Sequence, residues 1–380
     1  MRGLSRARFF FAMLCALDGL DAASHAGRHG KELASRSAEE KTGWMEMGMR
    51  FLGRMLLTLG LFAGPTALHA QGNWPERPIT LIVPYAAGGY TDLVGRLTAR
   101  YLEKTLGKSV IVDNRAGAGG IVGTQAVASS PPDGYTLCVC SVGAISVAPF
   151  AQKISYDPLK DLAPVGIVST IVQAVIVKKD LPVNSPAELV AYAKANPGKL
   201  NYGSAGAGGL THYAAELFEA RTGTLMVHIP YKGGAPATTA VMAGDVDLSF
   251  ANMTDALPQI EAGTVRGIAV TSRERSPYLP NLPSIHETVA PDFLVETWNG
   301  VLVAPKTPEA IISKLSDALI KMADDPEIKE QMRKAGATTV KNTPAQFRAQ
   351  IEQEMAQWKP LVAEIVAKEQ AKEKGQANRN

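Results

Sequence analysis

The chain has 380 residues, with 39 Lys and Arg against 36 Asp and Glu, and 46% of its residues are hydrophobic. This length predicts about two domains, and a charged fraction of 20% with 6% aromatic residues excludes a chain that is disordered throughout. A net charge of +3 excludes nucleic-acid binding by bulk electrostatics. Residues 71–380 contain as many acidic as basic residues, so any attraction for an anion must be built locally.

Residues 49–70 have the layout of a secretory signal peptide. Arg50 and Arg54 precede an apolar run at 55–63, and the segment ends at a small residue, Ala70. The apolar run is too short to span a bilayer, which takes about 20 residues. We therefore predict a soluble protein that is exported to the periplasm through a cleaved signal peptide. Residues 1–48 are interpreted as an over-extended start, with translation beginning near Met49.

From residue 79 onward, short β-branched runs alternate with segments of helical periodicity. Leu93, Val94, Leu97 and Tyr101 recur at helical spacing after the first of these runs. The predicted order is strand 79–83, this helix, strand 110–112, helix 120–128 and strand 135–140. Because parallel neighbours require crossover connections, this alternation predicts a parallel sheet with helices on its faces.

A second series of the same kind follows. It opens with a helix whose start is a capping box, formed by Ser185 and Glu188 with Pro186 at the first helical position. The remaining predicted elements are strand 200–202, helix 211–220, strand 227–230, helix 235–243, strand 246–250, helix 255–262 and strand 265–270. Residues 272–291 are rich in proline and polar residues and are predicted to be loop. The two series predict two similar α/β domains.

Two long apolar segments are candidates for the connections between these domains. Residues 165–177 would form the first crossing and 296–304 the second, and two crossings make a hinge around which two lobes can close. Helices opening at Thr307 and at the Thr343–Gln346 capping box follow, and the last carries an amphipathic stripe. The predicted boundaries are 74–172 plus 299–368 for lobe 1, 173–298 for lobe 2, and 369–380 for a polar, frayed tail.

Cys138 and Cys140 are the two cysteines that follow the leader. As alternate residues of one predicted strand, they point to the same face. A bond between them would need unusual geometry, so we predict buried free thiols. The mature histidines are scattered and show no zinc spacing, so neither a metal nor a cofactor is expected.

Three glycine-rich loops follow predicted strands and precede helices, at 84–92, 115–120 and 203–212. Glycine lets the backbone approach a ligand closely, and the first turn of a helix presents unpaired N–H groups with partial positive charge. Such a turn can hold a carboxylate or phosphate without lysine or arginine. Since the first and third loops fall in different predicted domains, they predict a shared anion site at the carboxyl ends of both sheets. A single loop of this kind could also serve only as a tight turn.

Other readings of these loops find less support in the sequence. The third loop lacks the final glycine of a dinucleotide fingerprint, and neither loop contains Gly-Lys-Ser/Thr. Ser204, His212 and Asp92 could be a nucleophile, base and acid, but no Gly-x-Ser-x-Gly elbow is present. Thr91 and Asp92 are better read as caps of the following helix. Asn252 and Ser141, together with Ser146, are further candidates at strand ends.

Several segments together resemble the substrate-binding receptors of tripartite tricarboxylate transporters, the Bug receptor family. They are WPERPI at 74–79, PYAAGGYTD at 84–92, DNRAGAGGIVGT at 113–124, PPDGYTL at 131–137, NYGSAGAGGLTH at 201–212, PYKGGAPA at 230–237 and GDVDLSF at 244–250. The resemblance implies an α/β, periplasmic-binding-protein-like fold: two α/β lobes joined by a two-crossing hinge, as in a Venus flytrap. It also implies a non-enzymatic receptor that delivers a small organic carboxylate to transporter membrane subunits, acting as a monomer.

The resemblance further implies which residues contact the ligand. In the first loop these are Tyr85, Ala87, Gly88, Gly89, Tyr90, Thr91 and Asp92, and in the third loop Ser204, Ala205, Gly206, Gly208, Thr211 and His212. Many members have an aspartate directly after the strand equivalent to 246–250, where this chain has Ala251 followed by Asn252. This departure argues against an amino-acid ligand. Tyr90 is bulkier than the small residue often found at its position, which predicts a narrower pocket.

We therefore expect a periplasmic receptor that closes two lobes on an organic acid, with citrate-like, dicarboxylate and aromatic acids all open as ligands. An exported α/β hydrolase-like enzyme is one alternative, and it would require Ser204 or another hydroxyl near His212 and an acid. A ligand-binding partner of a membrane sensor is the other alternative, and the sequence does not separate it from a transport receptor.

Overall fold

The computed structural model describes residues 74–377, with side chains through Ala367. The expected over-extended start, the signal peptide and residues 378–380 lie outside this range. The strands are β1 (Ile79–Val83), β2 (Val110–Asn114), β3 (Thr136–Ser141), β4 (Ala163–Val177), β5 (Asn201–Ser204), β6 (Val227–Pro230), β7 (Leu248–Asn252), β8 (Arg266–Val270), β9 (Glu296–Val303) and β10 (Ala337–Thr339). The helices are α2 (Tyr90–Leu106), α3 (Ile121–Ala128), α4 (Ala148–Ala151), α5 (Pro186–Ala195), α6 (Leu210–Thr222), α7 (Gly234–Ala243), α8 (Met253–Glu261), α9 (Ile285–Thr288), α10 (Glu309–Met322), α11 (Pro326–Lys334) and α12 (Pro344–Ala377).

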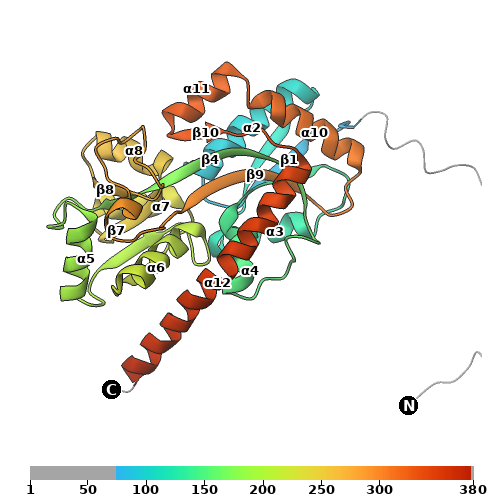
Figure 1. The fold of residues 1–380 in the computed structure, drawn as a ribbon. Coiled ribbons are helices and arrows are strands. Elements are labelled where there is room, and N and C mark those ends of the chain that lie inside the picture. Colours follow the sequence, from blue (N-terminus) through green and yellow to red (C-terminus); the bar gives the residue numbers. More distant parts are fainter. Residues whose placement is uncertain (1–73, 378–380) are drawn as a thin grey trace, which may run out of the picture. The chain divides into compact units, whose positions relative to one another are not determined.

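The two predicted parallel sheets are confirmed. Strand β1 pairs in parallel with β2 and β3, and β5 pairs in parallel with β6 and β7. Helices connect these strands, as parallel pairing requires. Figure 1 shows the two groups of strands at the two ends of the long strand β4, each with its own helices around it. This is the two-lobed α/β architecture that the resemblance implied.

The long strand β4 belongs to both sheets. Its residues from Ala163 to Val172 pair antiparallel with β9, and those from Gln173 to Val177 pair antiparallel with β7. Strand β10 also pairs antiparallel with the first part of β4, and β8 with its second part. The β-branched, apolar composition of β4 suits a strand that is buried on both faces. Strand β4 therefore carries the chain from one lobe into the other.

The hydrophobic core is divided by sheet face and not by lobe. Neighbouring residues Leu81 and Ile82 of β1 belong to different buried clusters, and so do Ala174 and Val175 of β4. Side chains of a strand alternate between faces, so each cluster covers one side of the joined sheets and includes residues of both lobes. Helix α12 covers one face, where it contacts β4, α4 and α6, and it crosses the molecule obliquely in Figure 1.

The predicted capping boxes form with one difference. Thr343 and Gln346 exchange both expected hydrogen bonds at the start of α12, at 3.2 and 2.9 Å. At α5, the Glu188 N–H donates to the Ser185 hydroxyl at 3.2 Å, but the Glu188 carboxylate accepts from the Asn184 N–H at 2.8 Å instead of from Ser185. Both acceptors still satisfy N–H groups that a helix start leaves unpaired.

Several elements differ from the sequence prediction. The predicted strand 246–250 lies two residues further on, as β7, so Asn252 is its last residue. Helix α11 and strand β10 were not predicted, and α9 lies inside the segment predicted to be loop. The chain beyond residue 366 was expected to fray, but α12 continues to Ala377. Its alanine, lysine, glutamate and glutamine residues are strong helix formers, which accounts for this extension.

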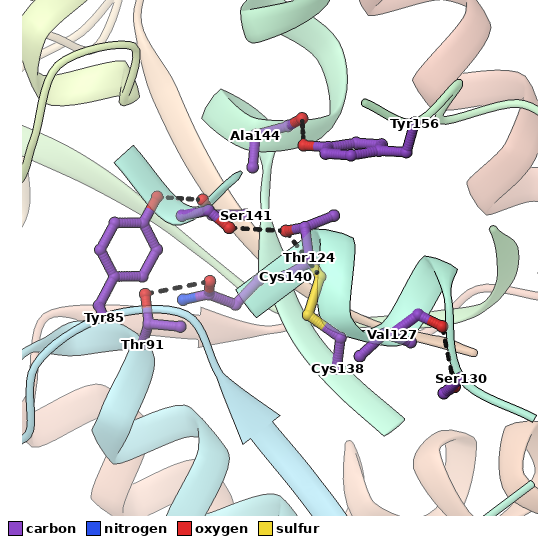
Figure 2. The surroundings of a disulfide bond; sticks show 12 residues. Tyr85, Thr91, Thr124, Val127, Ser130, Cys138, Cys140, Ser141, Ala144 and Tyr156 are labelled. Carbon is purple, nitrogen blue, oxygen red and sulfur yellow. Dashed lines mark hydrogen bonds between the residues drawn. A yellow bond between two sulfur atoms is a disulfide. The ribbon is translucent and has the colours of Figure 1, made fainter. Parts of the chain in front are cut away.

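The prediction of free thiols is wrong, because Cys138 and Cys140 form a disulfide. Their Cα atoms lie 5.3 Å apart, within the range that a disulfide spans. Both side chains project from the same face of β3, so the two sulfur atoms can bond without a reversal of the strand. Figure 2 shows the bond beneath Thr124, whose hydroxyl lies 3.4 Å from the Cys140 sulfur.

Candidate functional site

A small cavity lies where the carboxyl ends of β1, β3, β5 and β7 converge. The volume of this cavity is about 30 Å³. Its walls come from both lobes and include the starts of helices α2 and α6. The lining residues are Tyr85, Ala86, Gly89, Tyr90, Thr91, Ser141, Ala205, Leu210, Thr211, Gly234, Asn252, Asp255 and Thr297. Open α/β sheets bind ligands at this edge.

The first glycine-rich loop is fastened by Asp92. One oxygen of its carboxylate accepts hydrogen bonds from the Gly88 N–H at 3.0 Å and from Arg96 Nε at 2.8 Å. The other accepts from the Asn114 amide at 3.0 Å. Burial alone would raise the pKa of Asp92, but the bonds from Arg96, Gly88 and Asn114 outweigh it and lower the pKa. Asp92 thus holds the loop in its conformation from the side away from the cavity, and it does not line the cavity.

Hydroxyl groups of this loop are tied to other elements. The Tyr85 hydroxyl donates to the Gly119 carbonyl at 2.7 Å and lies 2.8 Å from the Ser141 hydroxyl, and burial raises the pKa of Tyr85 to about 12. The Tyr90 hydroxyl lies 2.9 Å from the Ser169 hydroxyl on β4. Figure 2 shows Tyr85 directed at Ser141, with Thr91 below them. Tyr85 and Ser141 together offer polar atoms at the cavity wall.

The third glycine-rich loop is held by internal hydrogen bonds. The Thr211 hydroxyl accepts from the Ala205 N–H at 2.8 Å, and the Ser204 hydroxyl accepts from the Gly206 N–H at 3.1 Å. Both bonds turn the chain so that Ala205 and the first turn of α6 reach the cavity. This end of the cavity contains small and hydroxyl-bearing side chains and an N-terminal helix turn, which is suited to an anion.

A pair of histidines lies behind this loop. The His212 and His228 rings stack with centroids 3.9 Å apart, and His228 Nε2 lies 2.6 Å from the Ser204 hydroxyl. The Glu216 carboxylate lies 3.7 Å from His212 Nε2. Burial and the neighbouring His228 lower the pKa of His212 to about 3, and burial lowers the pKa of His228 to about 4. Both rings are therefore neutral at pH 7.

This arrangement bears on the enzyme alternative. Ser204 contacts His228, whereas the acid Glu216 lies beside the other ring, His212. Among the hydrogen bonds and ion pairs of residues 74–367, His228 has no carboxylate partner. Ser204, its histidine and an acid therefore do not form the connected chain of hydrogen bonds that a catalytic triad requires. Neither Ser204 nor the two histidines line the cavity. His228 was missed by sequence reasoning, because nothing local marks a strand histidine as the partner of a serine 24 residues away.

Asp255 is another residue that sequence reasoning missed. It lies in the first turn of α8 and extends to the starts of α2 and α7. A Cβ placed on Gly89 would lie 3.4 Å from one of its carboxylate oxygens, and one on Gly234 would lie 2.1 Å from the other. Burial raises the pKa of Asp255 to about 7, although the Tyr90 N–H counters part of this effect. Its position three residues after a strand end was the available signal.

The second glycine-rich loop contacts the third and does not line the cavity. A Cβ on Gly119 would lie 2.4 Å from the Gly209 nitrogen and 2.6 Å from the Ala207 carbonyl oxygen. The Ala86 N–H also donates to the Lys232 carbonyl at 2.9 Å. Backbone therefore meets backbone across the lobes beside the cavity, and only a residue without a side chain fits at Gly119.

The predicted site residues fall into two groups. Those that line the cavity are Tyr85, Gly89, Tyr90, Thr91, Ser141, Ala205, Thr211 and Asn252. Those that lie outside its lining are Ala87, Gly88, Asp92, Ser204, Gly206, Gly208 and His212. The structure adds Ala86, Leu210, Gly234, Asp255 and Thr297. Within the described part of the chain, no group of three His, Cys, Asp or Glu side chains could hold a metal ion.

Two α/β lobes that both contribute to one cavity between them are the architecture of periplasmic binding proteins. The solved structure of the periplasmic binding protein BugD is 36% identical, with a TM-score of 0.74 over 77% of this chain and 98% of that chain. The sequence profile of the "Tripartite tricarboxylate transporter family receptor" matches residues 94–366. The chain belongs to this receptor family.

Two further solved structures are similar to this chain. R. palustris Rpa4515 with adipate is 33% identical, with a TM-score of 0.74 over 77% of this chain and 98% of that chain. MatC from Rhodopseudomonas palustris with bound malate is 29% identical, with a TM-score of 0.74 over 76% of this chain and 100% of that chain. Among residues 74–377, no helix combines the length and the apolar character needed to cross a membrane.

Proposed function

We propose that this protein captures a small organic carboxylate in the cavity between its lobes and delivers it to the membrane subunits of a tripartite tricarboxylate-type transporter. The observation that carries the proposal is that the starts of α2 and α6, one from each lobe, line the same cavity. N–H groups at helix starts compensate the lost hydration of a buried carboxylate. The adipate and malate in the two Rhodopseudomonas structures support this ligand class.

Capture requires the lobes to move. The cavity volume of about 30 Å³ is smaller than a dicarboxylic acid needs, so the ligand must enter a more open form, and the lobes then close around it as far as its size allows. A ligand favours closure only through contacts that the open form lacks. We propose that the lobe boundary lies on β4 between Val172 and Gln173, where its strand partners change. The chain would return at the start of β9, close to the crossing predicted at 298–299, because β9 pairs with the first part of β4 from Glu296 onward. The proposed receptor acts without catalysis, as a monomer in the periplasm.

A thermal unfolding assay tests the proposal. Protein is unfolded and refolded to remove bound ligand, then screened with adipate, malate, citrate, succinate and benzoate. A ligand at 100 times its Kd stabilises the folded protein by about 2.7 kcal/mol, which a rise in Tm detects. Failure of every acid to raise the Tm would overturn the proposal.

A pair of variants in one loop locates the binding. Ala205→Asp places a carboxylate at the cavity wall and should abolish the rise in Tm, because like charges repel at short range. Ala207→Asp adds the same charge to the same loop at an exposed position outside the cavity lining, and should retain the response. Equal responses of both variants would contradict this location.

A further inference from the structure

The Asp255 carboxylate lies in a setting that the proposed function does not explain. Its residue is 7% exposed, and it contributes to the cavity wall. One oxygen, Oδ2, has no hydrogen-bond partner among the described residues. A buried carboxylate oxygen without a donor costs free energy, and burial raises the pKa of this group to about 7. The site therefore lacks one hydrogen-bond donor.

The cavity wall does not supply that donor. The lining residues include no lysine, arginine or histidine, and Asp255 is their only carboxyl group. The neighbouring acid Asp92 differs in this respect, because Gly88, Asn114 and Arg96 satisfy both of its oxygens. Asp255 is thus the one acidic group that a ligand in the cavity would meet directly.

The acidic character of the cavity lining is consequently confined to Asp255. Ala205 and Thr211 line the cavity at the start of α6, and neither they nor Tyr85 and Ser141 carry an acidic side chain. Next to Gly89 and Gly234, which precede or begin helices α2 and α7, the wall instead presents the Asp255 carboxyl group. A carboxylate placed beside Asp255 would be repelled by its ionised form, whereas an ammonium group would stabilise that form.

We propose that Asp255 selects ligands with an amino group, so that the preferred ligand class is an amino-carboxylic acid whose ammonium group donates to Asp255 Oδ2. The ligand carboxylate then binds at the start of α6. This inference rests on the proposed function, since it assigns the ligand class of the same cavity. It also reverses an expectation from the sequence: Ala251 removes an acid at one position, and Asp255 provides one four residues later.

Matched acids test the inference by titration calorimetry on refolded, ligand-free protein. Succinate, malate and aspartate share a four-carbon chain and differ by a hydrogen, a hydroxyl or an amino group. Adipate, 2-hydroxyadipate and 2-aminoadipate repeat the comparison with six carbons. A charge-assisted hydrogen bond at a buried site corresponds to about a ten- to hundredfold change in affinity. The amino acid of at least one series should bind more tightly than its two analogues by about this factor.

Variants connect the preference to Asp255. Asp255→Asn keeps the shape of the side chain and should remove the amino preference, with the plain dicarboxylate bound as well as before or more tightly. Asp255→Ser is the second variant, should the asparagine disturb folding. Glu309→Gln is the matched control, because Glu309 is an exposed acid in the first turn of α10, away from the cavity.

The outcomes separate this inference from the proposed function. If acids bind but Asp255→Asn leaves the ratio of amino to plain acids unchanged, the inference fails and the carboxylate receptor stands. A preference for the hydroxy acids that depends on Asp255 would also overturn it, because the donor would be a hydroxyl. If no acid binds to the wild-type protein, the proposed function fails, and the inference fails with it.

Discussion

At the scale of single residues, two aspartates near the start of α2 play different parts because their surroundings differ. Asp92 receives hydrogen bonds from the backbone of its own loop and from Asn114 on β2, so its charge is satisfied by the fold. Asp255 receives the Tyr90 N–H and leaves one oxygen for another donor. A satisfied carboxylate stabilises structure, and an unsatisfied one in a cavity is a candidate for recognition.

Replacement of Asp92 tests its structural part. Asp92→Asn should lower the free energy of unfolding by about 1.5–3 kcal/mol at pH 7, mainly through the bonds from Gly88 and Asn114. The exposed Arg96 should contribute little. Because folding lowers the pKa of Asp92 from its ordinary 3.8, the stabilisation is present above that pH and is lost as the pH falls through the folded-state pKa.

Urea unfolding from pH 7 to pH 3 measures this effect. Asp113→Asn is the control, since Asp113 forms an exposed ion pair with Arg115 at 2.8 Å and its loss should cost about 0–1 kcal/mol. A difference between Asp92→Asn and wild type that stays constant down to pH 3 would contradict the assignment.

At the scale of elements, the three glycine-rich loops have two different structural roles. The loops at 84–92 and 203–212 place helix starts at the cavity, whereas the loop at 115–120 packs its backbone against 206–209. All three loops are rich in glycine, because glycine permits both a close approach to a ligand and a close approach to another chain segment. Only the contact partner distinguishes the two uses.

Gly119→Ala tests whether this backbone contact is needed for closure. The added Cβ would lie 2.4 Å from the Gly209 nitrogen, so the lobes should fail to close fully and ligand affinity should fall about tenfold or more. Gly107→Ala is a matched control, because Gly107 has a similar backbone angle, with φ of +71° against +62°, but no atom within 4 Å of its Cβ position. Both variants bear the left-handed backbone cost of about 1–2 kcal/mol.

Calorimetry and small-angle scattering with ligand measure affinity and closure for the two variants. Wild-type affinity and ligand-induced compaction in Gly119→Ala would show that the contact is dispensable.

At the scale of the whole molecule, the buried titratable groups oppose one another in acid. The folded state binds fewer protons than the unfolded state at His212 and His228, whose ordinary pKa of 6.5 falls to about 3 and about 4. It binds more protons at Asp255, whose pKa rises from 3.8 to about 7. Two histidines against one aspartate leave a net loss of stability as the pH falls from about 6.5 towards 4. Burial also raises the pKa of Glu354 above its ordinary 4.5, so this second carboxyl group reduces the loss at the acid end of the range.

The slope of this loss can be measured by urea unfolding across that pH range. Each histidine contributes up to about 1.4 kcal/mol for each pH unit, so His228→Gln should flatten the decline. Asp255→Asn should steepen it, because it removes the opposing group. The same slope in all three proteins would contradict the linkage. The carboxylate that faces the histidine pair is that of Glu216, which lies 3.7 Å from His212 Nε2.

Much of the architecture was determined by the sequence itself. Periodicity and capping residues predicted most strands and helices from residue 79 to the last helix, and the alternation of strand and helix predicted the parallel sheets, because these signals depend on neighbours in the chain. Helix α11 and strand β10 escaped prediction, since the nine-residue helix is largely polar and the three-residue strand is ordered by pairing with β4. The motifs also indicated the family and two of the loops that line the cavity.

The tertiary structure alone decided which groups meet between the lobes. Asp255 reaches the start of α2 and Gly119 packs against Gly209, because β4 runs through both sheets and sets how the two lobes face each other. Within one lobe, the pairing of β5 with β6 brings Ser204 to His228. The geometry of β3 likewise joins Cys138 to Cys140. No local pattern encodes such contacts, since they depend on the relative placement of segments far apart in the chain.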